Sequence, residues 1–201
     1  MLSKHKREIL NFIQEEGSIT IRQCAKIIYH GRKYGYDMSR KTLRSLYQDK
    51  AIARYRYNMT AETIYYINQR LGIHALKLLD VYAEFIDLGC TIETFKKKYR
   101  IYTNGKKYRE IDALLELNYQ EYFIPLIIEI DYSHMTSIQK LQEIYESNHF
   151  QQLYLEKLGE EIYPTVIIVR PVTTNSLVED HVFSILYSDF ELSNLAKVLN
   201  N

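Results

Sequence analysis

Several residue types are scarce in this chain of 201 residues, and each scarcity excludes a class of protein. Tryptophan is absent, and the chain has only two cysteines, Cys24 and Cys90. Two cysteines are too few for a disulfide framework or a zinc cluster. Three prolines and seven glycines, beside 46% apolar side chains, exclude a disordered or collagen-like chain. The composition therefore indicates a globular protein with a sizeable core.

Membrane and targeting segments are missing as well. No stretch of the sequence approaches the ~20 uncharged apolar residues that a membrane helix needs. The first ten residues, MLSKHKREIL, run from charged residues into an amphipathic pattern without the apolar block of a signal peptide. We therefore expect a soluble, cytoplasmic protein that has no membrane partner.

The sequence also lacks the motifs of several enzyme classes. Neither G-x-x-x-x-G-K-[ST] nor G-x-G-x-x-G occurs, so ATP-driven and dinucleotide chemistry have no support. The six histidines are scattered, without the H-x-H pair that a relaxase uses to hold a metal beside its nucleophilic tyrosine. Self-sufficient DNA nicking is therefore not expected.

Charge is distributed unevenly along the chain. Residues 1–71 carry 14 Lys and Arg against 6 Asp and Glu, a balance of +8. Residues 72–201 carry 12 against 19, a balance of −7, so the net charge of +1 hides the difference. This asymmetry predicts that the first part meets a polyanion and the second part has another role.

The basic part has the pattern of a winged helix-turn-helix domain over residues 1–71. Apolar residues at helical spacing predict three short helices, the second beginning after Thr20 and the third capped by Ser39. Two β-rich runs, 51–57 and 63–67, follow around a turn and predict a hairpin, the wing of such a domain.

The third helix and the hairpin supply the candidate DNA contacts. If Leu43, Leu46 and Tyr47 face the core, the opposite face carries cations and an amide at intervals of four residues, as in a recognition helix. The wing arginines suit phosphate or minor-groove contacts. The predicted DNA-binding residues are Ser39, Arg40, Lys41, Arg44, Gln48, Arg54, Arg56 and Asn58.

The acidic part, residues 72–201, predicts an α/β domain with the order α-β-β-β-α-β, so the whole chain is expected to be α+β. The expected elements are a helix over 72–89, a first hairpin turning at Asn104-Gly105, strands over 108–117 and 122–131, a long helix over 137–158 and a buried strand over 163–170.

Three acids lie near the ends of the two predicted central strands. Period-two geometry places Glu129 and Asp131 on one face, and Asp112 approaches both across a hairpin. Carboxylates gathered in this way bind Mg²⁺. The alternative is that the acids cap neighbouring helices or face water, in which case no metal cofactor is involved.

In this strand order the acids resemble the PD-(D/E)xK nuclease core, in which a carboxylate on one strand joins an E-x-K pair on the next. The chain departs from that pattern because Asp131 stands where the lysine would be. Lys140, on the following helix, is the candidate substitute. The resemblance implies a restriction-endonuclease-like domain whose catalytic residues, if it is active, are Asp112, Glu129, Asp131 and Lys140.

The wider combination resembles the replication-relaxation and MobC-like mobilisation proteins of plasmids and integrative elements in Gram-positive bacteria. It rests on the winged helix followed by IDALLEL, PLIIEIDYS and KLQEIY, and covers about residues 5 to 170. Asp112, Glu129, Asp131, Lys140 and Tyr145 fall on the matching pattern. The resemblance implies an accessory factor that binds an origin of transfer or replication and helps a relaxase, with a degenerate nuclease-like half for docking or dimerisation.

Three hypotheses follow from the sequence. The first is a non-catalytic factor that binds double-stranded DNA and contacts a relaxase, another relaxosome protein or a second copy of itself. The second is an endonuclease that depends on Mg²⁺. The third is a winged-helix transcriptional regulator.

Overall fold

The computed structural model describes residues 2–103, 107–132, 134–171, 177–178 and 182–200. The chain forms two compact units, Met1–Asp87 and Leu88–Asn201, and each is described by itself. Both units combine helices with a β-sheet, so the expected α+β class is confirmed. The predicted Asn104-Gly105 turn lies outside the described residues.

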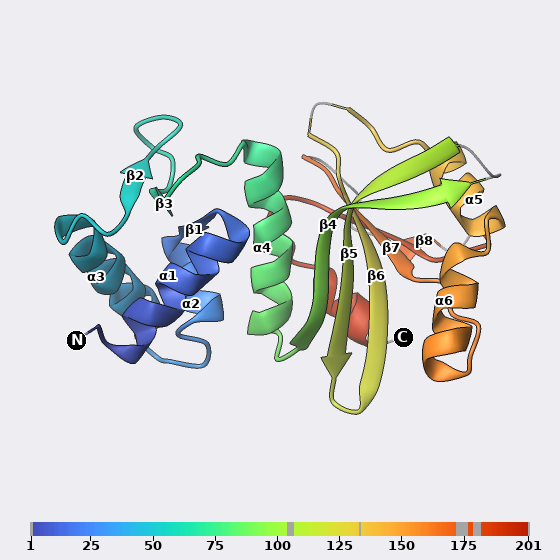
Figure 1. Cartoon of the computed structure of the whole chain (residues 1–201), viewed down its shortest axis with the longest axis horizontal. Coiled ribbons are helices and arrows are strands. Elements are labelled where there is room, and N and C mark those ends of the chain that lie inside the picture. Colours follow the sequence, from blue (N-terminus) through green and yellow to red (C-terminus); the bar gives the residue numbers. More distant parts are fainter. Residues whose placement is uncertain (1, 104–106, 133, 172–176, 179–181, 201) are drawn as a thin grey trace. The chain divides into compact units, whose positions relative to one another are not determined.

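The first unit contains four helices and three short strands among its described residues (Figure 1). In chain order they are α1 (Lys4–Glu16), β1 (Ser18–Thr20), α2 (Ile21–Ile27), α3 (Gly35–Gln48), β2 (Ala53–Tyr55), β3 (Ile64–Tyr66) and α4 (Ile73–Asp87). The strands form an antiparallel sheet in the order β1-β3-β2. The hairpin expected after the third helix is therefore present, and β1 extends it to three strands.

Local sequence signals determine where the first two helices begin and end. Thr20 and Gln23 form a capping box, in which each side chain accepts a hydrogen bond from the other residue's backbone N–H. Gly17 ends α1 with φ +100°, and a Cβ at this position would lie 3.0 Å from the Leu71 side chain. Glycine is therefore required here both by backbone conformation and by the close approach of Leu71.

The third helix begins earlier than the sequence predicts. Its first residue is Gly35, and the side chain of Ser39 lies inside the helix, fully buried, donating a hydrogen bond to the Gly35 carbonyl at 2.8 Å. A serine hydroxyl inside a helix often bonds the carbonyl four residues earlier, and a cap cannot be distinguished from this by sequence alone. The prediction that Ser39 caps the helix is wrong, and its burial removes it from the set of DNA-contacting residues.

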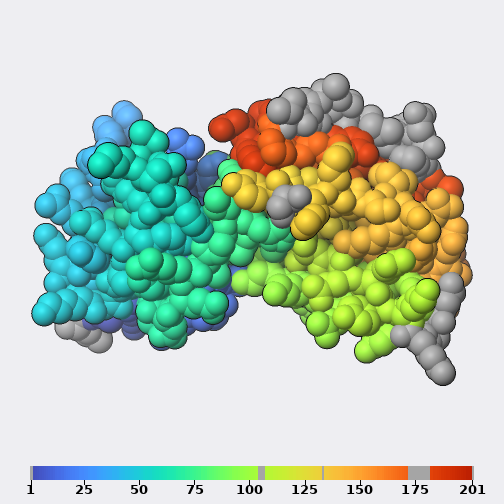
Figure 2. Space-filling model, turned by 90° about the horizontal axis from the view of Figure 1, so that it is seen from above, coloured from blue at the N-terminus to red at the C-terminus, as the bar shows by residue number. Residues whose placement is uncertain are grey.

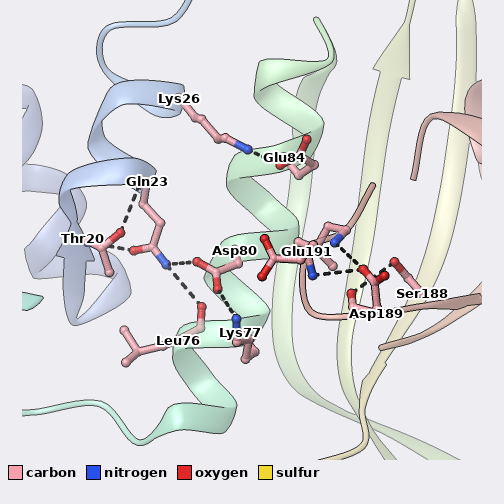
Figure 3. Close-up of polar contacts among 11 residues, drawn as sticks. Thr20, Gln23, Lys26, Leu76, Lys77, Asp80, Glu84, Ser188, Asp189 and Glu191 are labelled. Atoms are coloured by element: carbon pink, nitrogen blue, oxygen red, sulfur yellow. Dashed lines mark hydrogen bonds and ion pairs between the residues drawn. The ribbon is translucent and has the colours of Figure 1, made fainter. Parts of the chain in front are cut away.

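Helix α4 belongs to the first unit, so this unit extends past the predicted boundary at Leu71. The side-chain amide of Gln23, in α2, donates to the Leu76 carbonyl at 3.2 Å and to Asp80 Oδ1 at 2.8 Å (Figure 3). One helical turn further along α2, Lys26 forms an ion pair with Glu84 (Figure 3). These contacts of α4 with α2 place the division between the units after Asp87.

The second unit is built on a mixed sheet whose described strands lie in the order β4-β5-β6-β7-β9-β8. The strands are β4 (Thr91–Thr103), β5 (Lys107–Tyr119), β6 (Tyr122–Ile130), β7 (Thr165–Val169), β8 (Leu177–Val178) and β9 (Ile185–Ser188). Strands β4, β5 and β6 form an antiparallel meander, and β6, β7 and β9 run parallel. The remaining elements are α5 (Ile138–Glu146), α6 (His149–Leu158) and the 3₁₀ helix η1 (Leu195–Asn200).

The core of this unit lies between the sheet and helices α5 and α6. It includes the fully buried residues Leu114, Ile127, Leu141, Phe150 and Tyr154. The long helix expected over 137–158 is two helices, because Asn148 has φ +56° and breaks the helical backbone.

The turn before η1 is organised by one carboxylate. Asp189 Oδ1 accepts hydrogen bonds from the backbone N–H groups of Glu191 and Leu192, each at 3.0 Å (Figure 3).

Among the helices that the structure describes, none has the length and apolar character needed to span a bilayer.

Candidate nucleic-acid interface and acidic cluster

The exposed face of α3 carries the polar row that the sequence predicts. Leu43 and Leu46 are fully buried, and the helix turns its opposite face to solvent. The exposed polar residues on it are Arg40, Lys41, Arg44 and Gln48. Tyr47 departs from the prediction, because its side chain is 37% exposed rather than buried in the core.

Three residues of this row have no intramolecular partner in the part of the chain that the structure describes. Lys41, Arg44 and Gln48 form no side-chain hydrogen bond or ion pair with another described residue. Arg40 differs, since its guanidinium group pairs with Asp37 Oδ1 at 3.0 Å. The donors of the first three side chains are therefore available for an external acceptor.

The hairpin β2–β3 holds its two arginines in different ways. The Arg54 guanidinium lies over the Tyr47 ring of α3, 4.2 Å from the ring centroid, so this cation is stacked at the junction of helix and hairpin. Arg56 Nε donates to Thr63 Oγ1 at 2.7 Å, across the hairpin. Both arginine residues are exposed.

Asn58 has a structural role in the hairpin loop. Its Oδ1 accepts hydrogen bonds from the backbone N–H groups of Thr60 and Ala61, at 3.1 and 2.7 Å, which is an Asx turn. The side-chain oxygen is thus engaged within the loop that joins β2 to β3.

A basic hollow of about 270 Å³ lies beside α2 and the turn that leads to α3. Its lining includes four cationic side chains: Arg22, Lys26, Arg32 and Lys33. Arg22, Arg32 and Lys33 are exposed, whereas Lys26 is paired with Glu84 and Asp87. The hollow adds positive charge to the same unit as the α3 row.

In the second unit, the predicted acids do come together. The hydroxyl of Thr136 lies 3.3 Å from Glu129 Oε2 and 2.7 Å from Asp131 Oδ1. The carboxylates of Glu129 and Asp131, two residues apart on β6 and its end, therefore lie beside the same hydroxyl group. Asp112 Oδ2 accepts the backbone N–H of Ile130 at 2.7 Å, which places its carboxylate beside the same strand end. We call Asp112, Glu129 and Asp131 the acidic cluster.

Two cations of the chain neutralise the buried members of this cluster. Lys140 Nζ, from α5, donates to Glu129 Oε1 at 2.7 Å. The Arg170 guanidinium, directly after β7, donates to Asp131 Oδ2 at 2.9 Å. Both carboxylates are only 4% exposed.

Burial dominates the acidity of Glu129. It raises the pKa of this carboxyl from 4.5 to about 7, against the opposing effect of Lys140, while the negative charge of Asp112 raises it further. The carboxyl of Glu129 therefore changes its charge near neutral pH.

This arrangement does not fit a Mg²⁺ ion as it stands. Both oxygens of Glu129 and both of Asp131 accept hydrogen bonds from Lys140, Arg170 or Thr136. Lys140 and Arg170 thus already compensate the charge that a Mg²⁺ ion would compensate here. Among the residues that the structure describes, no group of three or more His, Cys, Asp and Glu side chains is arranged to hold a metal ion.

Sequence reasoning missed Arg170 and Thr136. Arg170 follows the buried run VIIV, and a run of this kind indicates a parallel strand whose end meets the end of β6. Tyr145 packs edge-on against the Tyr163 ring, with the centroids 5.0 Å apart, and so belongs to the core.

Comparison of the chain with protein families, curated proteins and solved structures gives no match.

Proposed function

We propose that the chain binds double-stranded DNA through its first unit, which acts as a winged helix-turn-helix module. The order of helices and strands in this unit, with a hairpin after the third helix and the sheet order β1-β3-β2, supports this interpretation. The excess of eight positive charges over residues 1–71 supports a polyanionic ligand.

The observation that carries the proposal is the set of unengaged donors on α3. Lys41, Arg44 and Gln48 are exposed and make no side-chain hydrogen bond within the described part of the chain. A guanidinium group can bond the guanine edge bidentately, and an amide can do the same with adenine. In this proposal α3 enters the major groove, with Arg44 and Gln48 toward the bases.

The hairpin β2–β3 takes the role of the wing. Arg54, stacked on Tyr47, and Arg56, held by Thr63, present cations from an ordered hairpin. Such groups suit phosphate or minor-groove contacts, which give affinity and register but little sequence discrimination. Asn58 orders the loop and is dispensable for DNA contact in this view.

The proposal is tested by separating sequence discrimination from general affinity. A selected duplex is first obtained from a random-sequence library and compared with scrambled DNA. Arg44→Ala is expected to weaken binding to the selected duplex by ~1–3 kcal/mol and to relax the preference over scrambled DNA. Arg56→Ala is expected to weaken binding to both duplexes similarly and to flatten the salt dependence.

Lys4→Ala is the charge-matched control for Arg44→Ala. Lys4 is an exposed residue of α1, and among the described residues its side chain pairs with Glu8 alone, at 3.7 Å. Its loss should lower the affinity for every duplex a little and leave the discrimination unchanged. If Arg44→Ala behaves like Lys4→Ala, α3 is not the reading helix and this orientation of the module is refuted.

For the second unit, we propose a nuclease-like domain that does not cleave DNA. Its strand and helix order and the placement of Asp112, Glu129 and Lys140 support the likeness to the PD-(D/E)xK core. The engagement of Asp131 by Arg170 and Thr136 supports a structural use of the cluster. Incubation with supercoiled DNA and Mg²⁺ or Mn²⁺ is expected to give no nicks.

An active endonuclease is the second candidate, favoured by the 2.7 Å contact of Lys140 with Glu129, which resembles the pairing of lysine and acid in that core. Nicking that needs the metal and disappears in Asp112→Ala would establish this candidate instead. Glu160→Gln, which changes an exposed charge of the same unit, is the control for contaminating nuclease.

The resemblance found in the sequence leads to a more specific proposal. The chain is an accessory factor that recognises an origin of transfer or replication and contacts a relaxase, while its second unit docks the relaxase or a second copy. Selective binding to an origin fragment beside a relaxase gene supports this. Binding confined to the promoter of its own gene would support a transcriptional regulator.

A further inference from the structure

One segment of the second unit is strongly basic, although the unit as a whole is acidic. Residues 96–110, KKKYRIYTNGKKYRE, contain seven of the twelve Lys and Arg of residues 72–201 and a single acid, Glu110. This segment covers the end of β4 and the beginning of β5, which form one antiparallel hairpin. In Figure 2 the yellow-green residues on either side of positions 104–106 lie on the surface of the second unit.

The two faces of the hairpin end differ. On one face Ile101 and Ile111 are fully buried in the core, and Arg109 pairs with Glu143 of α5. This face fixes the hairpin end on the rest of the unit.

The opposite face is aromatic and exposed. Tyr102 and Tyr108 are direct partners across the two strands and are 71% and 52% exposed. The guanidinium group of Arg100 lies over the Tyr108 ring, 5.0 Å from its centroid, and its Nε donates to Glu110 Oε2 at 2.9 Å. We call Arg100, Tyr102 and Tyr108 the hairpin patch.

Protection of a sheet edge explains only part of this composition. Lysines on an edge strand prevent pairing with a second chain, and Lys96, Lys97 and Lys98 suit that purpose. Edge protection does not call for two exposed tyrosines at directly opposed positions of the hairpin.

We propose that the hairpin patch binds single-stranded DNA. Exposed aromatic rings beside cations are the features that bind unpaired bases, because the rings stack on bases while the cations attract the backbone. Rings on directly opposed residues of antiparallel strands lie about 5 Å apart at their Cβ atoms, so one or two consecutive bases can stack on them. The buried side of the hairpin anchors the backbone that carries both tyrosines.

A single strand fits the patch better than a duplex does. In a duplex the base faces are covered by their neighbours, so tyrosine rings on a protein surface find nothing to stack on. The patch also lies in a different unit from α3, and its proposed role does not depend on duplex binding by the first unit.

The test measures binding of the full chain to a labelled oligothymidylate and to a blunt duplex of mixed sequence, by fluorescence anisotropy at low salt. The double variant Tyr102→Ala, Tyr108→Ala is expected to bind oligothymidylate roughly tenfold or more weakly, with duplex affinity unchanged. The corresponding double Phe variant keeps the rings and should retain the parent affinity.

Tyr122→Ala is the matched control, because Tyr122 is equally exposed, at 70%, but stands beside Glu121 and outside the cationic segment. It should bind both ligands like the parent. Arg44→Ala should alter duplex discrimination without changing oligothymidylate affinity, so failure of this proposal is distinguishable from failure of duplex binding by α3.

A second measurement avoids any dependence on folding of the variants. Photocrosslinking of the parent chain with a bromodeoxyuridine oligonucleotide should label Tyr102 or Tyr108. The proposal is overturned if the parent does not bind oligothymidylate or if the crosslinks fall only in the first unit. It is also overturned if the double Ala variant keeps its affinity, or loses single-strand and duplex affinity alike.

Discussion

Replacement of Lys140 by methionine tests whether the acidic cluster is held together by the cations of the chain. In the folded protein Lys140 Nζ lies 2.7 Å from Glu129 Oε1, and the Lys140 and Glu129 side chains are 23% and 4% exposed. Removal of one partner from a buried pair leaves an uncompensated charge and costs ~3–5 kcal/mol. Because Lys140 is partly exposed and Glu129 can take up a proton when its partner is lost, we expect a smaller cost, about 2 kcal/mol, in the free energy of unfolding at pH 8.

The cost of this substitution should depend on pH. The folded-state pKa of Glu129 is raised to about 7 by burial, above its unfolded value of 4.5, so the folded protein takes up a proton between these values. Its contribution to stability is therefore fully present below pH 4.5 and is lost as the pH rises through 7. Without Lys140 the pKa of Glu129 rises further, so at pH 5 the carboxyl is neutral and the cost of Lys140→Met falls to about 1 kcal/mol.

Urea unfolding of parent and variant at pH 5 and pH 8, followed by circular dichroism, measures the difference. The control compares the double variant Glu129→Gln, Lys140→Met with the single variant Glu129→Gln. Because neither has a carboxyl at position 129, the difference between their free energies of unfolding should be the same at both pH values. If Lys140→Met destabilises the protein equally at both pH values, Glu129 does not titrate near neutral pH and the reasoning fails.

Three further outcomes are expected. Gln23→Ala should lower the free energy of unfolding of the first unit by about 2 kcal/mol, because the hydrogen bonds that the side-chain amide donates to Leu76 and Asp80 are lost from a buried site. A urea titration measures this, and an unchanged midpoint would contradict it. Burial raises the pKa of the Cys24 thiol to about 12 and that of Cys90 to about 11, so neither should react with iodoacetamide at pH 8 until urea unfolds the chain; mass spectrometry detects the adducts. Gly17→Ala should destabilise the first unit by more than 1 kcal/mol, since φ is +100° and the new methyl group meets Leu71; an equal thermal midpoint would refute the strain.

Patterns of short range predicted much of the fold. The helix capped at Thr20, the hairpin after α3 and the shared face of Glu129 and Asp131 depend on residues close in sequence, and the structure shows all of them. Period-two and period-3.6 spacing determine such features directly.

Features of longer range could not be predicted. The packing of α4 on α2 depends on contacts of Gln23 with Asp80, residues far apart in the chain, and no local pattern reports them. Arg170 joins the acidic cluster only because β7 lies parallel to β6. Local signals were also ambiguous at Ser39, which has the residue type of a cap, and at Asn148, whose left-handed backbone interrupts an otherwise helical pattern.

Strand β4 has a consequence for self-association. Among the described strands it pairs with β5 alone, so it is the edge strand on that side of the sheet. This edge strand carries three successive lysines, and the last of them, Lys98, has a positive φ that departs from regular strand geometry. Lysines on an edge strand discourage pairing with the same strand of a second copy, so β4 is built against growth of the sheet from one molecule to the next.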